Sequence, residues 1–401
     1  MQGGKTVQRI GIYGGTFNPP HIGHVRAAEY AVEALQLDKL LMIPAYAAPH
    51  KALPENTPSP RQRLQMLQLS IGGNQRISAS DLEICREGTS YTYETIGQVQ
   101  QQYPNAQLYL LMGSDMFTSF STWKCADMIS SQVTLVVLLR GEQAEQKRIQ
   151  ESAAQMQHAQ VVYLKNPVTE ISSTQMRRLL ALRCAEEYLP KGVGNYIRQQ
   201  GLYAGNTDYR GLSEEALEKT VVGLLKPNRV AHVLGCRDTA VRLARHYGVN
   251  ETHAARAALL HDITKALDGP LQLTLCRGYG IVLDDFSFQN LKTLHALTGS
   301  VAAERIFGED KPVVDAIRSH TTGKADMNLL EKIIYVADYM EPNRDFEGVE
   351  QMRELADTDI TAALRMGLNM TVELLIKQNR AVSPESRQAL EYLKQEEKGK
   401  E

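Results

Sequence analysis

The stretch Gly11–His24, GIYGGTFNPPHIGH, decides the fold of the first half of this 401-residue chain. It joins a short apolar run, 9–13, to a segment, 22–36, whose apolar residues have helical spacing. The glycine pair 14–15 marks the turn between them and lets the backbone approach a phosphate closely. His21 and His24 share one face of the helix start, where unpaired N–H groups and the helix dipole favour anions. The pattern predicts a phosphate-binding strand–turn–helix unit.

Strand-like and helix-like segments continue to alternate from this unit to about residue 203. We expect further strands at 39–44, 76–84, 108–112, 133–139 and 161–164, with helices between them. This alternation predicts an α/β Rossmann-like domain with a mostly parallel sheet and helices on both faces. Its ligand is expected at the carboxyl ends of the strands.

The alternation stops at a segment rich in Gly, Asn, Asp and Tyr, 201–211. Ser213 then has the character of a helix N-cap, and a period of 3.6 residues dominates the rest of the chain. Helical segments are expected at 213–225, 230–247, 251–267, 291–307, 312–319, 329–340 and 349–377. We therefore predict a first domain of residues 1–203, a linker of 204–212 and an all-α domain of 213–401.

Composition restricts the class of protein. Hydrophobic residues make up 43% and charged residues 22%, as in ordinary globular chains, and the formal net charge of −2 argues against nucleic acid as a partner. The longest apolar run, near 133–139, is far below the ~20 residues of a membrane helix, and 1–8 lacks an apolar signal core. Five cysteines without a CxxC pair indicate reduced thiols. We expect a cytoplasmic protein without a membrane partner, and homo-oligomerisation stays open.

A second candidate for phosphate binding is Ile171–Arg177, ISSTQMR. Its serine and threonine hydroxyls can cap a helix and donate to phosphate oxygens, and Arg177 adds a forked cation. Together with the GTF turn at 15–17 and the HIGH sequence at 21–24, this segment resembles the HxGH and ISSTxxR signatures of the nucleotidylyltransferase superfamily. Asn18 occupies a position where that superfamily also has aspartate.

Intermediate segments narrow the resemblance, over about residues 7–203, to bacterial nicotinate-nucleotide adenylyltransferases. They are PHK at 49–51, GTSYT at 88–92, GSD at 113–115 and WK at 123–124. The resemblance implies that the phosphate of nicotinate mononucleotide attacks the α-phosphorus of ATP, with Mg²⁺ bridging the phosphates and pyrophosphate leaving. Such chemistry needs positioning and charge stabilisation rather than a protein nucleophile.

The resemblance also implies roles for individual residues. His21, His24 and Arg177 become catalytic, with the two histidines stabilising the α-phosphate. Thr92 and Trp123 become the residues on the pyridine side. The full substrate-binding set implied for this half is Gly14, Gly15, Thr16, Phe17, Lys51, Thr92, Asp115, Trp123, Ser172, Ser173 and Thr174.

The second half carries a constellation of histidine and aspartate. Its segments are RVAHVLGC, ALLHDITK, HALTGS, RSHTTG and ADYMEPNR, which contain His232, His261, Asp262, His295, His320 and Asp338. Four imidazoles and two carboxylates suit iron, manganese, cobalt or another divalent ion. The set resembles the HD phosphohydrolase superfamily. The resemblance implies a two-metal site, with iron as the first choice and Asp262 as the bridge, in which a metal pair about 3.5–4 Å apart activates water.

The pieces HTTG at 320–323 and DYMEPNRDFEGV at 338–349 narrow this resemblance, over about 213–395, to bacterial HD-type symmetrical dinucleoside tetraphosphatases. The resemblance implies cleavage of diadenosine tetraphosphate to two ADP. It also implies that Asp262 and Lys265 are catalytic and that the phosphates are contacted by Arg229, Lys265, Arg318 and Arg344. Glu347 stands where that family often has proline, which puts the shape of the local loop in doubt.

The main interpretation is a bifunctional enzyme that joins these two activities. One alternative keeps the transferase but changes its acceptor to nicotinamide mononucleotide, phosphopantetheine or a cytidylyl acceptor. A second makes the HD domain a nucleotide-binding sensor that regulates without turnover, and a third makes it a phosphohydrolase of another nucleotide. Candidate ligands at all six positions favour catalysis over sensing.

Overall fold

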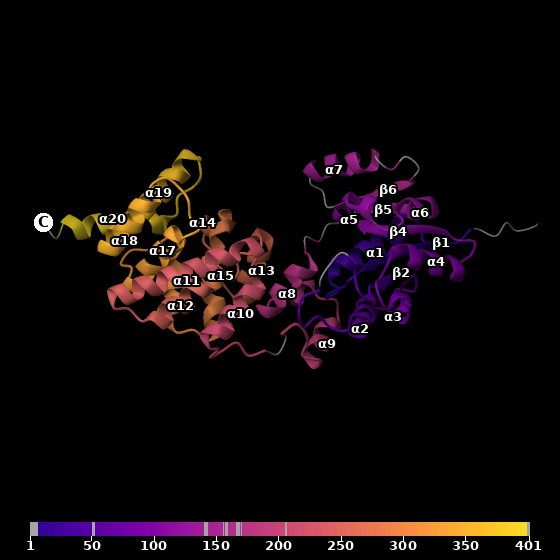
Figure 1. Ribbon diagram of the computed structural model, residues 1–401, viewed down its shortest axis with the longest axis horizontal. Coiled ribbons are helices and arrows are strands. Elements are labelled where there is room, and N and C mark those ends of the chain that lie inside the picture. The colour runs from indigo at the N-terminus through magenta and orange to yellow at the C-terminus, as the bar shows by residue number, and fades with distance from the viewer. Residues whose placement is uncertain are drawn as a thin grey trace, which may run out of the picture. The chain divides into compact units, whose positions relative to one another are not determined.

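The computed structural model describes residues 7–49, 53–139, 143–154, 156, 159–165, 169, 171–204 and 207–398. The chain divides into two compact units (Figure 1). The first comprises Met1–Ala181 and Ala185–Asn206, and the second comprises Leu182–Cys184 and Thr207–Glu401. Each unit is described by itself.

Six parallel strands form the sheet of the first unit. They are β1 (Arg9–Gly15), β2 (Lys39–Pro44), β3 (Ile77–Ala79), β4 (Gln107–Gly113), β5 (Thr134–Leu138) and β6 (Val161–Leu164). The order across the sheet is β3-β2-β1-β4-β5-β6, and every neighbouring pair is parallel. The order reverses between β1 and β4, so the carboxyl ends of these two strands form the crevice where doubly wound sheets bind ligands.

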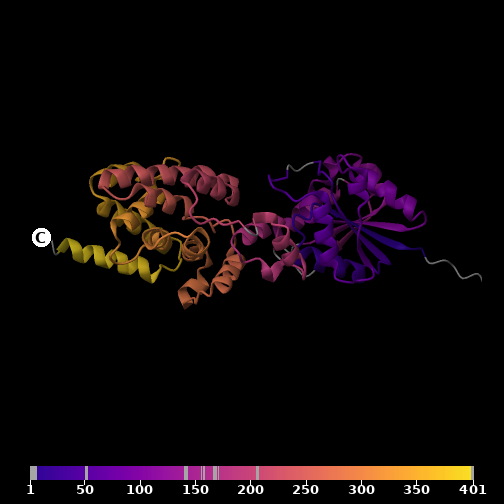
Figure 2. The ribbon, with the colours of Figure 1, turned by 90° about the horizontal axis from the view of Figure 1, so that it is seen from below.

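Helices cover both faces of this sheet (Figure 2). Alternate side chains of a strand point to opposite faces. Leu40 and Met42 pack with α1 on one face, and Leu41 and Ile43 pack with α4 on the other. The predicted α/β Rossmann-like class is therefore confirmed. The helices of this unit are α1 (Ile22–Ala34), α2 (Pro60–Ile71), α3 (Leu82–Arg86), α4 (Thr92–Gln102), α5 (Ser114–Thr118), α6 (Ala126–Gln132), α7 (Gln143–Ala154), α8 (Ser173–Ala181) and α9 (Val193–Gln199).

One strand was predicted too long. Residues 76–84 were expected to be extended, yet β3 stops at Ala79 and α3 begins at Leu82. The apolar residues at 82 and 84 keep the spacing of two that is typical of a strand, although they lie in a single helical turn. The backbone N–H of Cys85 donates to the carbonyl of Asp81 at 2.8 Å and closes that turn.

The described residues of the second unit form helices without a strand, as predicted. α11 packs along α12 and α17, and α15 packs along α16. The candidate metal-binding residues lie on these five helices or directly after them. The helices are α10 (Glu214–Leu224), α11 (Pro227–Tyr247), α12 (Glu251–Leu260), α13 (Gly269–Tyr279), α14 (Asp285–Gln289), α15 (Leu294–Ala302), α16 (Lys311–Ser319), α17 (Leu329–Met340), α18 (Val349–Thr358), α19 (Ile360–Lys377) and α20 (Pro384–Lys398).

Two predicted helices of this unit end or divide earlier than expected. The segment 251–267 is helical only to Leu260, and tight turns follow in which Lys265 N–H donates to the Asp262 carbonyl at 3.0 Å. The segment 349–377 is two helices, because the Asp359 carboxylate accepts the first N–H groups of α19 and starts a new helix. Within the described part of the chain, every helix is too short or too polar to cross a membrane.

Candidate active sites

The first candidate site lies where β1 ends and α1 begins, at the reversal of strand order. His21 is the N-cap of α1, and its backbone N–H donates to His24 Nδ1 at 3.2 Å. The centroids of the two imidazole rings lie 3.7 Å apart, and the ring planes are tilted by 31° to each other. Because His24 Nδ1 accepts a hydrogen bond, the proton of the neutral ring resides on Nε2. That Nε2–H can donate to an anion.

The two signature motifs meet at the loop between β1 and α1, where the Asn18–Pro19 peptide bond is cis. Arg177 Nη1 donates to the Asn18 carbonyl at 2.8 Å, and Ser173 Oγ donates to the Pro19 carbonyl at 3.2 Å. Thr174 Oγ1 accepts from Arg177 Nη2 at 3.1 Å. The ISSTQMR segment therefore holds the loop that carries His21 and His24, although about 150 residues separate the motifs.

Ser172 and Tyr203 complete this arrangement. Ser172 Oγ accepts from Gln175 N–H at 3.2 Å and so caps α8, as predicted for the serine and threonine run. The Tyr203 hydroxyl donates to Asn18 Oδ1 at 2.6 Å, and Asn18 Nδ2 donates to Thr57 at 3.2 Å. Burial raises the pKa of Tyr203, so its phenol remains a donor at every working pH. Sequence reasoning missed Tyr203, because it lies at the edge of the linker and belongs to no motif.

Arg63 is a second residue that sequence reasoning missed. It is 1% exposed, and its guanidinium donates to the carbonyls of Thr16 (2.8 Å), Ala45 (2.6 Å), Tyr46 (3.2 Å) and Pro58 (3.3 Å). Burial lowers its pKa, which nearby Tyr203 opposes. Arg63 thus ties the turn after β1 to the end of β2.

Replacing Arg63 with alanine is expected to destabilise the first unit by about 3 kcal/mol in total. The substitution removes a donor from four carbonyls whose hydrogen bonds are mostly only partly buried, and a fully buried carbonyl without a donor costs about 1–3 kcal/mol. Trp123, the single tryptophan, lies in this unit. Its fluorescence during urea unfolding measures the change. Arg61→Ala, at an exposed position of the same helix, is the control. Equal midpoints for the two variants would contradict the role assigned to Arg63.

The remaining predicted residues of this site lie at the carboxyl edge of the sheet. Gly14 and Gly15 end β1 beside Ile43 and Pro44, while Thr16 offers its carbonyl to Arg63. The Phe17 side chain is 1% exposed and packs edge-on against the His24 ring, with centroids 5.0 Å apart. Lys51 lies outside the described residues.

The two segments predicted for the pyridine side come together. Ser90 N–H donates to the Ala47 carbonyl at 2.9 Å, which fixes the GTSYT segment beside the end of β2. Lys124 Nζ lies 4.3 Å from the centre of the Tyr91 ring. Thr92 begins α4, Asp115 is exposed in the first turn of α5, and Trp123 packs against Phe120 with centroids 5.3 Å apart.

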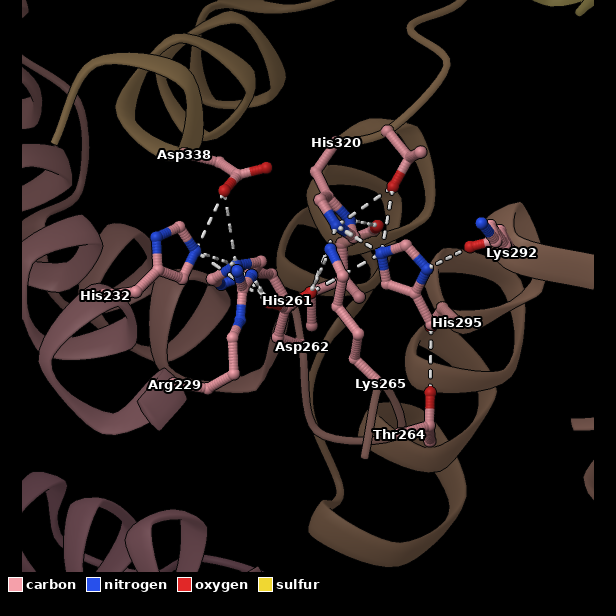
Figure 3. A network of polar contacts seen from close by, with 12 residues as sticks. Arg229, His232, His261, Asp262, Thr264, Lys265, Lys292, His295, His320 and Asp338 are labelled. Carbon is pink, nitrogen blue, oxygen red and sulfur yellow. Dashed lines mark hydrogen bonds and ion pairs between the residues drawn. The ribbon is translucent and has the colours of Figure 1, made fainter. Parts of the chain in front are cut away.

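The second candidate site lies inside the second unit (Figure 3). His232 comes from α11, His261 and Asp262 from the turn after α12, and His295 from α15. His320 directly follows α16, and Asp338 comes from α17. The four imidazoles and Asp262 are buried. All six predicted ligands therefore converge, and they group into sets whose ligand atoms lie within 4.8 Å of one another.

Asp262 lies between two pairs of histidine. Its Oδ2 is 3.5 Å from His261 Nε2 and 3.8 Å from His232 Nε2. Its Oδ1 is 3.4 Å from His295 Nε2 and 3.8 Å from His320 Nε2. One carboxylate thus presents one oxygen to each pair (Figure 3).

Asp338 joins one of these pairs. Its Oδ1 is 3.0 Å from His232 Nε2 and 3.7 Å from His261 Nε2. The donor set therefore has two halves that share Asp262. The first half is His232, His261 and Asp338, and the second half is His295 and His320.

Hydrogen bonds at the far ring nitrogens fix three of the imidazoles. Nδ1 of His261, His295 and His320 each donates to the carbonyl three residues earlier, at 2.7, 2.8 and 2.6 Å. A carbonyl only accepts, so each neutral ring presents an unprotonated Nε2 to the site. The Nε2 atoms of His295 and His320 lie 3.2 Å apart, where two lone pairs repel unless a cation lies near both. This arrangement fits a divalent metal.

The electrostatics of His295 and His320 agree with a role as ligands. Burial, reinforced by Lys265, lowers the pKa of His295 to about 4, and burial with His261 lowers that of His320 to about 3. Both rings are therefore neutral near pH 7. Burial opposes ionisation of Asp262, but the neighbouring His261 and Lys265 outweigh it and hold the carboxyl pKa well below its usual range.

Three of the four cations predicted for phosphate contacts pair with the same carboxylates. Arg229 pairs with Asp262 Oδ2, and Lys265 Nζ lies 3.2 Å from Asp262 Oδ1. Arg344 Nη2 donates to Asp338 Oδ1 at 2.9 Å. Arg318 is exposed in the last turn of α16, close in sequence to His320.

The fold and the two sites define a chain that joins a nucleotidyl-transfer domain to a metal-binding phosphohydrolase domain. A cytidylyltransferase-like family model matches residues 12–179, and an HD domain model matches residues 229–343. A Neisseria meningitidis protein named "probable nicotinate-nucleotide adenylyltransferase" is 34% identical over 201 residues, which cover 49% of this chain and 99% of that protein. A Halalkalibacterium halodurans protein named "bis(5'-nucleosyl)-tetraphosphatase, symmetrical" is 40% identical over 168 residues, 41% of this chain and 89% of that protein.

The chain therefore belongs to the nicotinate-nucleotide adenylyltransferase family in its first half and to the symmetrical bis(5'-nucleosyl)-tetraphosphatase family in its second half. Both are families of enzymes, and both predicted resemblances are confirmed. A solved structure of a predicted HD superfamily hydrolase involved in NAD metabolism, from Clostridium acetobutylicum, is 38% identical with a TM-score of 0.45. The match covers 46% of this chain and 98% of the Clostridium acetobutylicum chain.

Proposed function

We propose that the chain is a bifunctional enzyme. The first unit transfers an adenylyl group from ATP to nicotinate mononucleotide, giving nicotinate adenine dinucleotide and pyrophosphate. The second unit hydrolyses diadenosine tetraphosphate symmetrically to two ADP with a pair of divalent metal ions, iron being the first candidate. The relatives support each activity, because each aligns with one half of this chain over nearly its own full length.

The main support for the transferase proposal is that the segments 11–24 and 171–177 meet at the loop that contains the cis Asn18–Pro19 bond. The helix start and the His24 Nε2–H can stabilise charge on the α-phosphate as the acceptor phosphate approaches. Mg²⁺ bound with ATP would neutralise phosphate charge. Ser173, Thr174 and Arg177 lie beside the loop and present polar groups to the same region.

The transferase proposal is tested with the purified chain, ATP and Mg²⁺. Nicotinate mononucleotide and nicotinamide mononucleotide are offered separately, and products are separated by chromatography. We expect nicotinate adenine dinucleotide and pyrophosphate in equal amounts. Product from the nicotinamide substrate alone, or from neither substrate, would favour a different acceptor.

Replacing Gly23 with alanine is expected to slow adenylyl transfer about 10–100-fold, the range in which small displacements of catalytic groups act. A Cβ at this position would lie 3.0 Å from His21 Nδ1 and 3.1 Å from its Cε1, so the ring must shift. Steady-state kinetics measure the loss. The control is Gly97→Ala in α4, where a Cβ meets no atom within 4 Å. Equal rates for the two variants would refute this account of Gly23.

The convergence of six buried or half-buried donors in the second unit carries the hydrolase proposal. Metal ions bound there would supply Lewis acidity and a hydroxide at neutral pH. The imidazole Nε2 atoms and the two aspartates would hold the ions. Arg229, Lys265 and Arg344 would then balance the charge of a polyphosphate, which is the role predicted for them.

The hydrolase proposal is tested by loading the protein with Fe²⁺, Mn²⁺ or Co²⁺ and adding diadenosine tetraphosphate. ADP as the sole product is expected. A mixture of AMP and ATP would exclude symmetrical cleavage. Tight binding without turnover would favour the sensor alternative, and turnover of another nucleotide alone would assign a different substrate.

A further inference from the structure

Glu341 is a buried carboxylate behind the candidate metal site, and the predicted site residues did not include it. It directly follows α17 and is 1% exposed. Its Oε1 lies 3.1 Å from His232 Nδ1. Of the four described site imidazoles, His232 differs from the rest, because the other three Nδ1 atoms meet neutral backbone carbonyls.

Three features hold Glu341 in this position. Its Oε2 accepts from the Asn343 backbone N–H and from Asn343 Nδ2, both at 2.8 Å. Arg353 Nη2 donates to the Glu341 carbonyl at 3.0 Å. On α11, Gly235 leaves space for the carboxylate, since a Cβ there would lie 2.5 Å from Glu341 Oε2. The carboxylate is therefore held by its hydrogen bonds to Asn343 and fits the space that Gly235 leaves on α11.

Glu341 also makes the charges of the two halves unequal. The first half has Asp338 as a ligand and Glu341 behind His232, opposed by Arg344 and Arg229. The second half has no carboxylate of its own among the described residues and faces Lys265 through the shared Asp262. The four charges of the first half balance, whereas Lys265 leaves the second half with one positive charge, so the first half is one unit more negative than the second before the shared Asp262 is counted.

We infer that Glu341 is a positioning residue that fixes His232 as a metal ligand and makes the first half the tighter of two unequal metal subsites. An acceptor at Nδ1 fixes the tautomer and orientation of a ligating imidazole, and an anionic acceptor strengthens its bond to the metal. Divalent metal then fills the first half before the second. The inference rests on the proposed metal-dependent function.

The test measures binding of Mn²⁺ to the metal-free full-length protein, with the free ion counted by electron paramagnetic resonance. The wild type is expected to bind two ions in unequal steps. Glu341→Gln is expected to weaken the tighter step about 10–100-fold, the usual effect of losing an outer partner of a ligand, and to change the weaker step less than about threefold. His295→Ala is expected to remove the weaker step and keep the tighter one.

Two further variants separate positioning from folding. Gly235→Ala keeps Glu341 but crowds its carboxylate, and it is expected to weaken the same step. Glu331→Gln is the matched control, because Glu331 is fully buried near the start of α17 and pairs with Lys324 at 2.6 Å, away from the histidines. Thermal unfolding of each metal-free variant, followed by circular dichroism, shows which of them keep the fold.

The outcomes are distinct for the inference and for the proposed function. A folded wild type that binds no Mn²⁺ would refute the metal-dependent function itself. Two equal steps in the wild type would overturn the inference and leave the metal site standing. The inference would also be overturned, with the metal site left standing, if folded Glu341→Gln and Gly235→Ala bind Mn²⁺ as the wild type does. It would be overturned too if either variant weakens only the weaker binding step.

Discussion

Replacing Asp262 with asparagine is expected to lower kcat/KM for diadenosine tetraphosphate by about 10³-fold and to reduce the bound metal from two ions to one. Removal of a charge-stabilising group costs about 10²–10³-fold, and in the proposed site both ions depend on the Asp262 carboxylate. Asp262 presents Oδ1 to one histidine pair and Oδ2 to the other. Asparagine has a similar shape but a single oxygen, so it can ligate in one half only. Elemental analysis and chromatography of ADP measure the two effects.

The control for this substitution is Asp315→Asn, which removes an aspartate of α16 that pairs with the exposed Lys311 at 2.7 Å. It is expected to keep two metal ions and full hydrolysis. Asp262→Asn protein that retains both ions would show that the carboxylate does not bridge the halves. Retained metal with lost hydrolysis would instead assign Asp262 to the substrate.

The second large effect is expected in the first unit. Replacing His24 with alanine should lower kcat for adenylyl transfer about 10²–10³-fold, the usual cost of removing one preorganised donor to developing charge. The KM for ATP should change less, because the Nε2–H contributes most when charge accumulates in the transition state. Initial rates over a range of ATP concentrations separate the two parameters.

Loss of His24 also removes the hydrogen bond from His21 N–H, so its effect on folding must be measured separately. The helix cap contributes about 0.5–2 kcal/mol, too little to unfold a typical domain. Glu29→Ala, at an exposed position of α1, is the control for changes to this helix. An unchanged kcat in folded His24→Ala protein would remove His24 from the catalytic set.

Much of the fold could be predicted from local patterns. The strands 39–44 and 161–164 were placed correctly to the residue, because each is a short apolar run with turn residues or charge at its ends. The helix start at Ser213 was also correct, since the Ser213 hydroxyl accepts from Ala216 N–H at 3.2 Å. The helix expected over 251–267 was wrong beyond Leu260, because apolar residues continue with helical spacing through turns that present His261 and Asp262.

The sites were predictable where a residue type itself carries the chemistry. Six histidine and aspartate residues in five spaced segments pointed to one donor set, and the structure gathers all of them. Arg63, Tyr203 and Glu341 escaped prediction because their roles depend on partners that come close only in the tertiary structure. An arginine in a polar helix or a glutamate before proline has the same local sequence whether it is solvated or buried.

The Tyr203 hydroxyl sets a limit on where the two halves of the gene could be separated. Its bond to Asn18 Oδ1 places one of the last residues of the first unit beneath the loop that carries both histidines. A fragment that stops before residue 203 would lose that donor and would fail as a transferase for a purely local reason. Whether the two activities are independent is therefore best tested with a first fragment that retains Tyr203. A shorter fragment would lose transferase activity even if the first unit does not need the second unit.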